Sequence, residues 1–537
     1  MTSGAPAPSP AVAPSRRPYL LGRAALFAVL VLVAAVRVRL RDVPLERDEG
    51  EYAYAGQLIL QGVPPYTLAY NMKFPGTYAA YALLMTVFGQ TAAGVRLGLM
   101  VVTTMTALMI YWVSRRLLDE TAGLVAAASF AVLAASPAMC GLAAHATHFC
   151  ALFAAAGLCA LWPPGRTMSW KRAGAGGFLF GLAVLMKQHA AVLWLWGAGS
   201  LAIAGLRQRD GPWLKRVEVP AAFCVGSVLP LGMTCLILWH VGVLERFWFW
   251  TVLYARQYAS MTTIKGDAPV AALAGVMENT SALWFLAVTG IGFVWRDDRL
   301  RGIRGSILTF ALASFLATCP GLLFRDQYFL VTLPAVALLA GSAVSGIQRS
   351  SVPFASQAGL AYAFLLAASI LQLRDVWLYA TPQEVSRLTY SGNPFVEAEL
   401  VADYIQQHST PETRIAVVGS EPQIYFLSRR RSATGYIYMY PLMESQPFAA
   451  RMQQEMIAEI ESARPEYVVY VTSTLSWLRE PSSNMAVFDW WTPYSKGFTP
   501  VLAAVADQEH GTRLLSSAEL GDLRESPGNG LLLFRRR

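Results

Sequence analysis

Charged residues are scarce in this chain of 537 residues, at 14% of the sequence. Soluble domains carry about 25% charged residues. Several soluble domains with large cores would still need a charged surface. Hydrophobic residues make up 55% of the chain, so the composition argues against a water-soluble protein and predicts an integral membrane protein.

Cysteine is also rare, and none of the six cysteines forms a CxxC pair or has the spacing of zinc ligands. They lie in or beside apolar segments, which is typical of small buried side chains. No cysteine follows Cys319, so no disulfide can stabilise the C-terminal region. The sequence also lacks GxSxG, HExxH and phosphate-loop motifs, which leaves no recognisable nucleophile or nucleotide site.

Apolar runs of about 17–25 residues, long enough to cross a bilayer, recur along the chain. They predict about eleven transmembrane helices, preceded by a disordered cytoplasmic tail over residues 1–18. The first run has no cleavage site and is interpreted as a retained signal anchor. The predicted spans are 19–36, 93–114, 121–138, 146–162, 173–187, 190–206, 218–240, 279–295, 305–323, 328–346 and 354–373.

Basic residues are concentrated in alternate connections between these spans, which accounts for the net charge of +9 without nucleic acid as a partner. The positive-inside rule places these connections in the cytoplasm. They are residues 114–120, 163–172, 206–216, 296–304 and 347–350. The N-terminus is then predicted to be cytoplasmic, and an odd number of spans places the C-terminal region outside.

Residues 19–378 are therefore predicted to form a multi-span membrane domain, and residues 379–537 an extracytoplasmic α/β domain. In the second region, short alternating segments predict a largely parallel sheet. The expected helices are 396–408, 421–428 and 446–463, and the expected strands are 414–419, 433–440 and 467–471. Ser420 is interpreted as the N-cap of the second helix.

The densest acidic cluster, Glu46, Asp48, Glu49 and Glu51, lies in the first external loop, residues 42–92. It begins a predicted amphipathic helix over residues 50–61, which a second helix over 76–88 follows. Glu46 is interpreted as solvated, whereas Asp48 and Glu51 share one helix face. Asp48 and Glu49 are candidate catalytic carboxylates, or else groups that the helix dipole stabilises.

Several cations occupy external turns, where the positive-inside rule disfavours them. They are Lys73, Lys187, Arg246, Arg256 and Arg325, with His189 beside Lys187. A cation at membrane depth is usually paired or functional, although each alone could extend to the lipid headgroups. Together they predict a site for a lipid-linked phosphate or pyrophosphate at the outer leaflet.

His145 and His148 are spaced i, i+3 and share one helix face. Two histidines can begin a metal site, and Asp48 or Glu49 could complete it in space. Buried or polar-lining histidines are the favoured interpretation, so no metal ligand is predicted here.

Four segments, "RDEGEYAYAGQLILQGVPPY", "KFPGTYAAYALL", "GLAVLMKQ" and "FRDQYFLVTLPAVALLAG", resemble the bacterial branch of the dolichyl-phosphate-mannose–protein mannosyltransferase-like family. The C-terminal "VVGSEPQIYFLSRRRSATGYIYMYPL" resembles the outer domain of its bacterial members. These are GT-C type glycosyltransferases, similar in layout to the aminoarabinose transferases that modify lipid A. The resemblance extends over nearly the whole chain.

The resemblance implies an inverting transfer of a hexose or pentose from a polyprenyl-phosphate donor to a hydroxyl acceptor. The acceptor would be a protein, a glycolipid or a polysaccharide at the outer face of a bacterial inner membrane. The family's catalytic aspartate corresponds to Asp48, with Glu49 as its motif partner, and its lysine to Lys73. The predicted substrate-binding residues are Tyr52, Lys73, Lys187, Gln188, Arg256, Arg325 and Tyr328. No cofactor is predicted, and a divalent cation is left open.

Two other functions compete with this one. A transporter or lipid flippase would place its polar residues at the membrane midplane on broken helices, whereas here the charges cluster at one surface. A non-catalytic partner in envelope assembly is the third hypothesis, and the intact Asp48–Glu49 pair argues against it.

Overall fold

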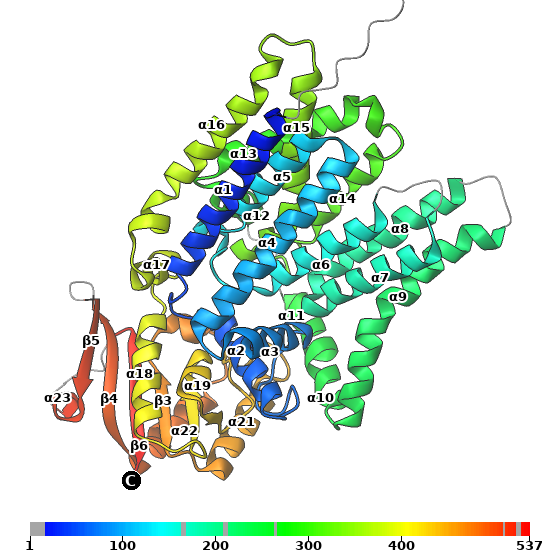
Figure 1. The fold of residues 1–537 in the computed structure, drawn as a ribbon. Coiled ribbons are helices and arrows are strands. Elements are labelled where there is room, and N and C mark those ends of the chain that lie inside the picture. Colours follow the sequence, from blue (N-terminus) through cyan, green and yellow to red (C-terminus); the bar gives the residue numbers. More distant parts are fainter. Residues whose placement is uncertain (1–16, 163–167, 208–212, 262–265, 508–510, 522–527) are drawn as a thin grey trace, which may run out of the picture.

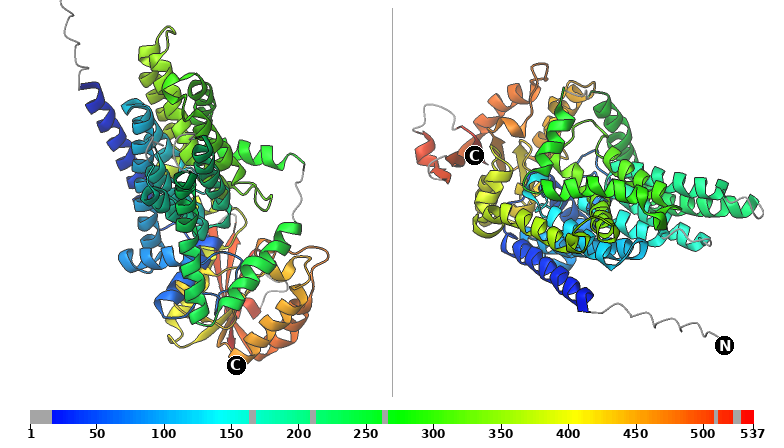
Figure 2. Two further views of the ribbon diagram at one scale, coloured as in Figure 1. Left: turned by 90° about the vertical axis from the view of Figure 1, so that its right-hand side faces the viewer. Right: turned by 90° about the horizontal axis from the view of Figure 1, so that it is seen from above.

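A computed structural model describes residues 17–162, 168–207, 213–261, 266–507, 511–521 and 528–537. Long helices form one part of the molecule, and a six-stranded sheet with its own helices lies at one end of them (Figures 1 and 2). Two short helices from residues 42–92, α2 and α3, lie where the two parts meet (Figure 1). This arrangement brings the acidic cluster against the C-terminal region.

The helical part contains the N-terminal α1 and the helices that follow it to the end of α16. Their bounds are α1 (Arg17–Arg39), α2 (Arg47–Leu60), α3 (Gly76–Phe88), α4 (Ala92–Leu117), α5 (Glu120–Leu133), α6 (Ala146–Leu161), α7 (Trp170–Met186), α8 (Ala191–Arg207), α9 (Trp213–His240), α10 (Leu244–Trp248), the π-helix η3 (Phe249–Tyr254), α11 (Ala255–Met261), α12 (Ala268–Met277), α13 (Ser281–Arg296), α14 (Arg304–Leu316), the 3-10 helix η5 (Asp326–Thr332), α15 (Leu333–Arg349) and α16 (Ala358–Gln372). Each apolar run predicted as a span coincides with a helix.

The predicted count of eleven spans is not confirmed. Within the described residues, six helical segments are long and apolar enough to cross a membrane, or seven if α12 and α13, bent by 111°, form one broken span. Helices α3, α5, α6 and α14 are apolar but shorter. These shorter helices are below the length of about 17 residues that spans the hydrocarbon core when a helix lies along the bilayer normal.

Three of the Arg-rich connections meet at one end of the bundle. Arg349 Nη2 lies 2.6 Å from Asp119 Oδ2, and Arg299 Nη1 lies 3.6 Å from the same oxygen. These residues come from the connections predicted over 347–350, 296–304 and 114–120. The shared ion pairs fit the prediction that these connections lie on one side of the membrane.

The C-terminal part contains a mixed sheet with the strand order β2-β1-β3-β6-β4-β5. Its elements are α17 (Pro382–Thr389), α18 (Phe395–Gln407), β1 (Arg414–Val418), α19 (Gln423–Ser428), β2 (Arg431–Ser432), α20 (Tyr440–Met443), α21 (Ala449–Ala463), β3 (Tyr467–Val471), α22 (Ala486–Tyr494), β4 (Phe498–Asp507), β5 (Gly511–Ser516), α23 (Ser517–Gly521) and β6 (Gly530–Arg536). β1 pairs in parallel with β2 and β3, whereas β6 and β4 add antiparallel pairs. The prediction of a largely parallel sheet is therefore wrong for its second half.

Two local predictions in this region are also wrong. The strand predicted over 433–440 does not form, because β2 ends at Ser432 and the following residues bond to other parts of the chain. Ser420 is not a helix cap, since Pro422 is the N-cap of α19. The Ser420 hydroxyl instead accepts a hydrogen bond from Met439 N at 2.8 Å, which holds the irregular segment against β1.

The sheet region packs directly on α2. A side chain at Gly50 would place its Cβ 2.6 Å from Cβ of Gln423, so only glycine permits this approach. Arg47 crosses the same interface, and its Nη2 lies 2.6 Å from the buried Glu421 carboxylate. Its Nη1 donates to the Tyr440 hydroxyl at 2.6 Å. A buried, fully paired arginine fixes the relative position of the two regions.

Candidate active site

The first turn of α2 is capped by Glu46, not by a Ser, Thr, Asp or Asn. Its carboxylate accepts hydrogen bonds from Asp48 N at 2.9 Å and Glu49 N at 2.8 Å. Glu46 is only 6% exposed, so the interpretation of this residue as solvated is wrong. By satisfying these two amides, Glu46 fixes the directions of the next carboxylates.

Asp48, Lys73 and Glu51 form an ion cluster at this turn. Lys73 Nζ lies 2.7 Å from Asp48 Oδ1 and 2.6 Å from Glu51 Oε2. The Tyr438 hydroxyl donates to Asp48 Oδ1 at 2.7 Å, and the Tyr78 hydroxyl donates to Glu51 Oε1 at 2.6 Å. The Asp48 side chain keeps 27% exposure and that of Lys73 23%, whereas Glu51 is fully enclosed. Asp48 and Lys73 are therefore the accessible members of the cluster.

The charges of this cluster reinforce one another. Burial alone raises the pKa of Asp48, but the Lys73 ammonium and the Tyr438 hydrogen bond outweigh it and hold the pKa well below its usual range. Burial lowers the pKa of Lys73, yet Asp48 and Glu51 together raise it above its usual value. At neutral pH the site therefore presents a carboxylate beside an ammonium.

Glu49 points away from this cluster. Its carboxylate accepts from Arg96 Nε at 2.8 Å, from Arg96 Nη2 at 2.5 Å and from Ala144 N at 2.6 Å. The side chain of Glu49 is completely buried and that of Arg96 is 3% exposed. With three donors and no exposed surface, Glu49 ties α2 to α4 and to the turn before α6.

Four of the residues predicted to bind substrate, Tyr52, Lys187, Gln188 and Tyr328, lie near the cluster. Lys73 Nζ lies 4.6 Å above the centre of the Tyr52 ring. Gln188 Nε2 donates to the backbone oxygen of Met72 at 2.7 Å. This bond holds the backbone beside Lys73. Lys187 Nζ lies 3.9 Å from the centre of the Tyr328 ring.

Arg325 and Arg256 lie farther out. Arg325 is the exposed N-cap of η5, close enough for its charge to act on Tyr440, and η5 also carries Tyr328. Arg256 is exposed on α11. Among the residues that the structure describes, no hydrogen bond or ion pair joins Arg256 to Asp48 or Lys73.

Glu46, Asp48 and His145 could together hold a metal ion, because one ligand atom of each lies within 4.8 Å of the others. Both nitrogens of His145 are buried without a hydrogen-bond partner. Burial lowers the pKa of His145 to about 3, so its imidazole is neutral, which is the form that binds metals. The donor set thus fits a divalent cation, and His148, also buried, is not part of the group.

Three residues of the site were not predicted from the sequence. Arg96 carried a usable signal, because a cation at the external end of a predicted span is disfavoured for the same reason as Lys73. Glu51 shares a helix face with Asp48, and this spacing is the signal that points to it. Tyr438 lies 390 residues from its partner Asp48, and no sequence pattern connects them.

Comparison with known protein sequences gives one family match. The model of the family described as dolichyl-phosphate-mannose-protein mannosyltransferase matches residues 73–239. No curated protein sequence matches the chain.

Two crystal structures of ArnT from Cupriavidus metallidurans share the fold. The structure bound to undecaprenyl phosphate has a TM-score of 0.60 at 14% identity, covering 95% of this chain and 97% of that chain. The apo structure has a TM-score of 0.59 at 15% identity, covering 97% and 98%. The likeness over both whole chains confirms the GT-C type fold that the sequence motifs predict.

Proposed function

We propose that this protein is a membrane glycosyltransferase that moves a sugar from a polyprenyl-phosphate donor to a hydroxyl acceptor. The observation that carries the proposal is the ion pair between Asp48 and Lys73. It is partly open to solvent, while the neighbouring carboxylates of Glu49 and Glu51 are enclosed. The reaction would take place where α2 meets the C-terminal region, at the extracytoplasmic face of a bacterial inner membrane.

The comparisons support the nature of the donor. ArnT from Cupriavidus metallidurans, which has the same fold, binds undecaprenyl phosphate. The matching family is named for a transferase whose donor is a dolichyl-phosphate sugar. A lipid-phosphate donor also suits the accessible cations of this site, because phosphate oxygens form strong charge-assisted hydrogen bonds with Lys and Arg.

In the proposed reaction, the acceptor hydroxyl oxygen attacks the anomeric carbon from the face opposite the phosphate. The bond from that carbon to the phosphate oxygen breaks, and polyprenyl phosphate leaves with the electron pair. Asp48 takes the proton of the attacking hydroxyl as the general base. A single displacement of this kind inverts the anomeric configuration. The lowered pKa keeps Asp48 ionised and ready to accept a proton at neutral pH.

Lys73 is proposed to pair first with the carboxylates of the site and then with the phosphate of the donor. Before the donor binds, it pairs with Asp48 and Glu51, and the incoming phosphate then competes for its ammonium. Transfer of Lys73 toward the phosphate stabilises the charge that develops on the leaving group. It also removes a hydrogen bond from Asp48, which strengthens this carboxylate as a base. Lys187 and Arg325, with Arg256 at the periphery, are proposed to attract the same phosphate.

The remaining predicted residues are proposed to position these groups. Tyr52 supports Lys73 through its ring, and Gln188 holds the backbone at Met72. Tyr328 holds Lys187 near the site. Glu49 is proposed to act through its buried pair with Arg96, by fixing the first turn of α2, and not as a reacting group.

The function is tested by purifying the wild-type protein in lipid nanodiscs with a panel of polyprenyl-phosphate sugars and an extract of envelope glycans and proteins. Release of polyprenyl phosphate, together with an inverted anomeric configuration in the product, is the expected result. A retained configuration would contradict the single displacement. Movement of labelled donor across vesicles that contain the protein, without any bond cleavage, would favour a lipid transporter instead.

A further inference from the structure

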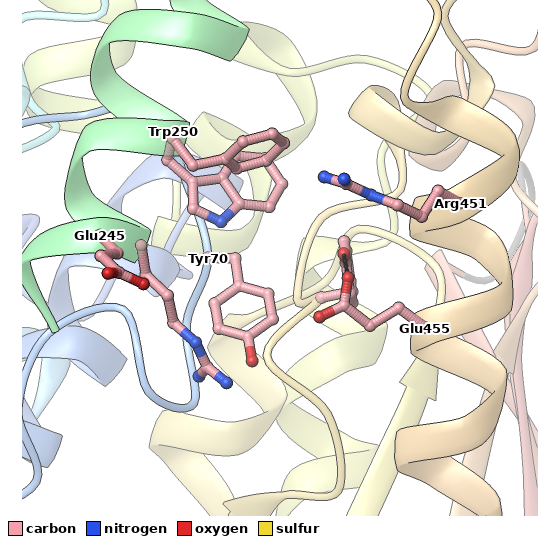
Figure 3. A pocket seen from close by; sticks show the side chains of 8 residues that line it. Tyr70, Glu245, Trp250, Arg451 and Glu455 are labelled. Atoms are coloured by element: carbon pink, nitrogen blue, oxygen red, sulfur yellow. Dashed lines mark hydrogen bonds between the residues drawn. The ribbon is translucent and has the colours of Figure 1, made fainter.

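A groove opens between the external helices of the membrane region and helix α21 of the C-terminal region (Figure 3). Its volume is about 380 Å³, within the range of about 300–1,000 Å³ that is typical of small-ligand sites. It is lined by Tyr70, Glu245, Arg246, Phe249, Trp250, Tyr436, Arg451 and Glu455. A second hollow of about 650 Å³ shares Tyr70, Arg246 and Glu455 with it, so the two form one extended groove.

Aromatic rings form the base of this groove. Tyr70 stacks on Trp250 at 5.9 Å between ring centroids, and Tyr436 meets both rings edge-on. Tyr70, Trp250 and Tyr436 are nearly buried, so their positions are fixed by packing. Phe249 is half-buried and extends the apolar surface.

Charged side chains of both signs form the rim. Glu245, Arg246, Arg451 and Glu455 are all exposed. Arg451 and Glu455 project from α21 toward Tyr70 and Trp250 on the other side (Figure 3). Within the described residues, Arg451 contacts only aromatic rings, and Glu245 has no hydrogen bond or ion pair. Glu455 accepts one hydrogen bond, from the Tyr436 hydroxyl at 2.8 Å. The rim therefore still offers free donors and acceptors, and its four charges sum to zero.

Two segments connect this groove to the catalytic cluster. Tyr436 lines the groove and Tyr438, two residues later, bonds to Asp48. Tyr70 lines the groove and Lys73 belongs to the cluster. The first pair is two residues apart and the second three, so their Cα atoms are separated by at most about 7 Å and about 11 Å. The groove therefore ends close to the reacting groups.

Gly435 is what allows these two segments to lie together. Tyr70 N donates to Gly435 O at 2.7 Å. A Cβ at position 435 would lie 2.2 Å from the Tyr70 ring, so any side chain there would displace this wall of the groove.

We propose that this groove binds the saccharide part of the acceptor, which makes the acceptor a glycan or glycolipid. Neighbouring sugar hydroxyls both donate and accept hydrogen bonds, so they match a rim that combines carboxylates with guanidinium groups. The C–H faces of a sugar ring suit aromatic surfaces, where weak C–H···π contacts add to apolar burial. The balance of two acids and two arginines favours a neutral ligand over a polyanion. This proposal rests on the proposed transferase function, whose acceptor it defines.

The test measures binding of a panel of neutral oligosaccharides to the full-length protein in nanodiscs, without donor, by saturation-transfer NMR. At least one oligosaccharide is expected to bind at millimolar concentration. Arg451→Gln and Glu455→Gln, both exposed changes on α21, are each expected to weaken binding by about tenfold or more. Glu461→Gln is the matched control on the same helix, because it lies outside the groove and should leave binding unchanged.

Several outcomes would overturn the proposal. They are no binding by any oligosaccharide, equal binding by the groove variants and the wild type, or binding of inorganic phosphate alone that Arg451→Gln abolishes. The transferase function is read separately from release of polyprenyl phosphate. Oligosaccharide binding without any release from any donor would contradict the transferase and leave the groove as a glycan-binding site.

Discussion

Adjacent carboxylates on α2 have opposite environments. Glu49 faces Arg96 inside the helical bundle, has three hydrogen-bond donors and is fully buried. Asp48 faces Lys73 and Tyr438 at the boundary with the C-terminal region, and its side chain keeps 27% exposure. A one-residue step along a helix turns a side chain by about 100°, which is enough to separate the interior from the site.

The difference shows which of the two acids can exchange partners. Removing one member of a buried, saturated pair leaves an uncompensated charge, so such a pair is retained for structure. A partly exposed pair is held less firmly, and a substrate phosphate can replace the carboxylate as the partner of the lysine. The inner pair is therefore assigned to stability and the outer pair to chemistry.

Glu49→Gln should have the largest effect, and that effect should be on stability. It leaves the Arg96 guanidinium buried without a counter-charge, at a cost of about 3–5 kcal/mol. Thermal unfolding in nanodiscs should show a large drop in midpoint, whereas Asp48→Asn should lower the midpoint less, because its side chain is partly exposed. Equal losses in the two variants would remove the distinction between the pairs.

Lys73→Gln should have the next largest effect, and on turnover more than on folding, because burial raises the pKa of Glu51 and this carboxyl can take up a proton when the ammonium is lost. Loss of one preorganised donor to a developing oxyanion costs about 10²–10³ in rate. Single-turnover release of polyprenyl phosphate measures this loss. Lys171→Gln, an exposed change far along the chain, should retain the wild-type rate. An unchanged rate in Lys73→Gln would exclude Lys73 as the group that stabilises the phosphate.

Tyr438→Phe removes the hydrogen bond that the C-terminal region supplies to Asp48. Hydrogen bonds to charged groups contribute about 1.5–3 kcal/mol, so turnover should fall by about tenfold to a hundredfold. Tyr404→Phe on α18 is the matched change outside the site. If both variants behave like the wild type, the C-terminal region does not contribute to the catalytic cluster.

The pH dependence of turnover in Lys73→Gln gives the smallest but most specific signal. In the wild type, the pKa of Asp48 lies below its usual value in the folded protein, so ionised Asp48 contributes to the free energy of unfolding above about pH 4. That contribution is lost as the pH falls through the lowered pKa. Without Lys73, burial raises the pKa of Asp48, and the acid limb of the pH–rate profile should move upward by about one unit or more. An unmoved acid limb would show that another group titrates.

Much of the helical fold could be predicted because apolar length is a local signal. All eleven predicted segments contain a helix, although α5, α6 and α14 are shorter than the predicted runs. The C-terminal sheet was harder, because strands β4, β5 and β6 pair antiparallel through contacts that no local period specifies. The segment predicted as a strand over 433–440 instead bonds to Tyr70, Asp48 and Ser420.

The residues of the site also divide into those with a local sequence signal and those brought in by long-range contacts. Asp48 and Lys73 were predicted from the resemblance, and the positive-inside rule independently marked Lys73 as unusual. Arg96 is unusual by the same rule, although the sequence analysis does not place it in the site. Tyr438 comes from the other region of the chain, so only the docking of that region on α2 reveals it.

The most direct test compares turnover and donor binding in Asp48→Asn. This variant keeps the shape of the side chain and a hydrogen-bond acceptor for Lys73, but it cannot act as a base at neutral pH. Release of polyprenyl phosphate from the sugar donor should be lost, while binding of undecaprenyl phosphate to the nanodisc-embedded protein should be retained. Turnover equal to that of the wild type would contradict the assignment of Asp48 as the base.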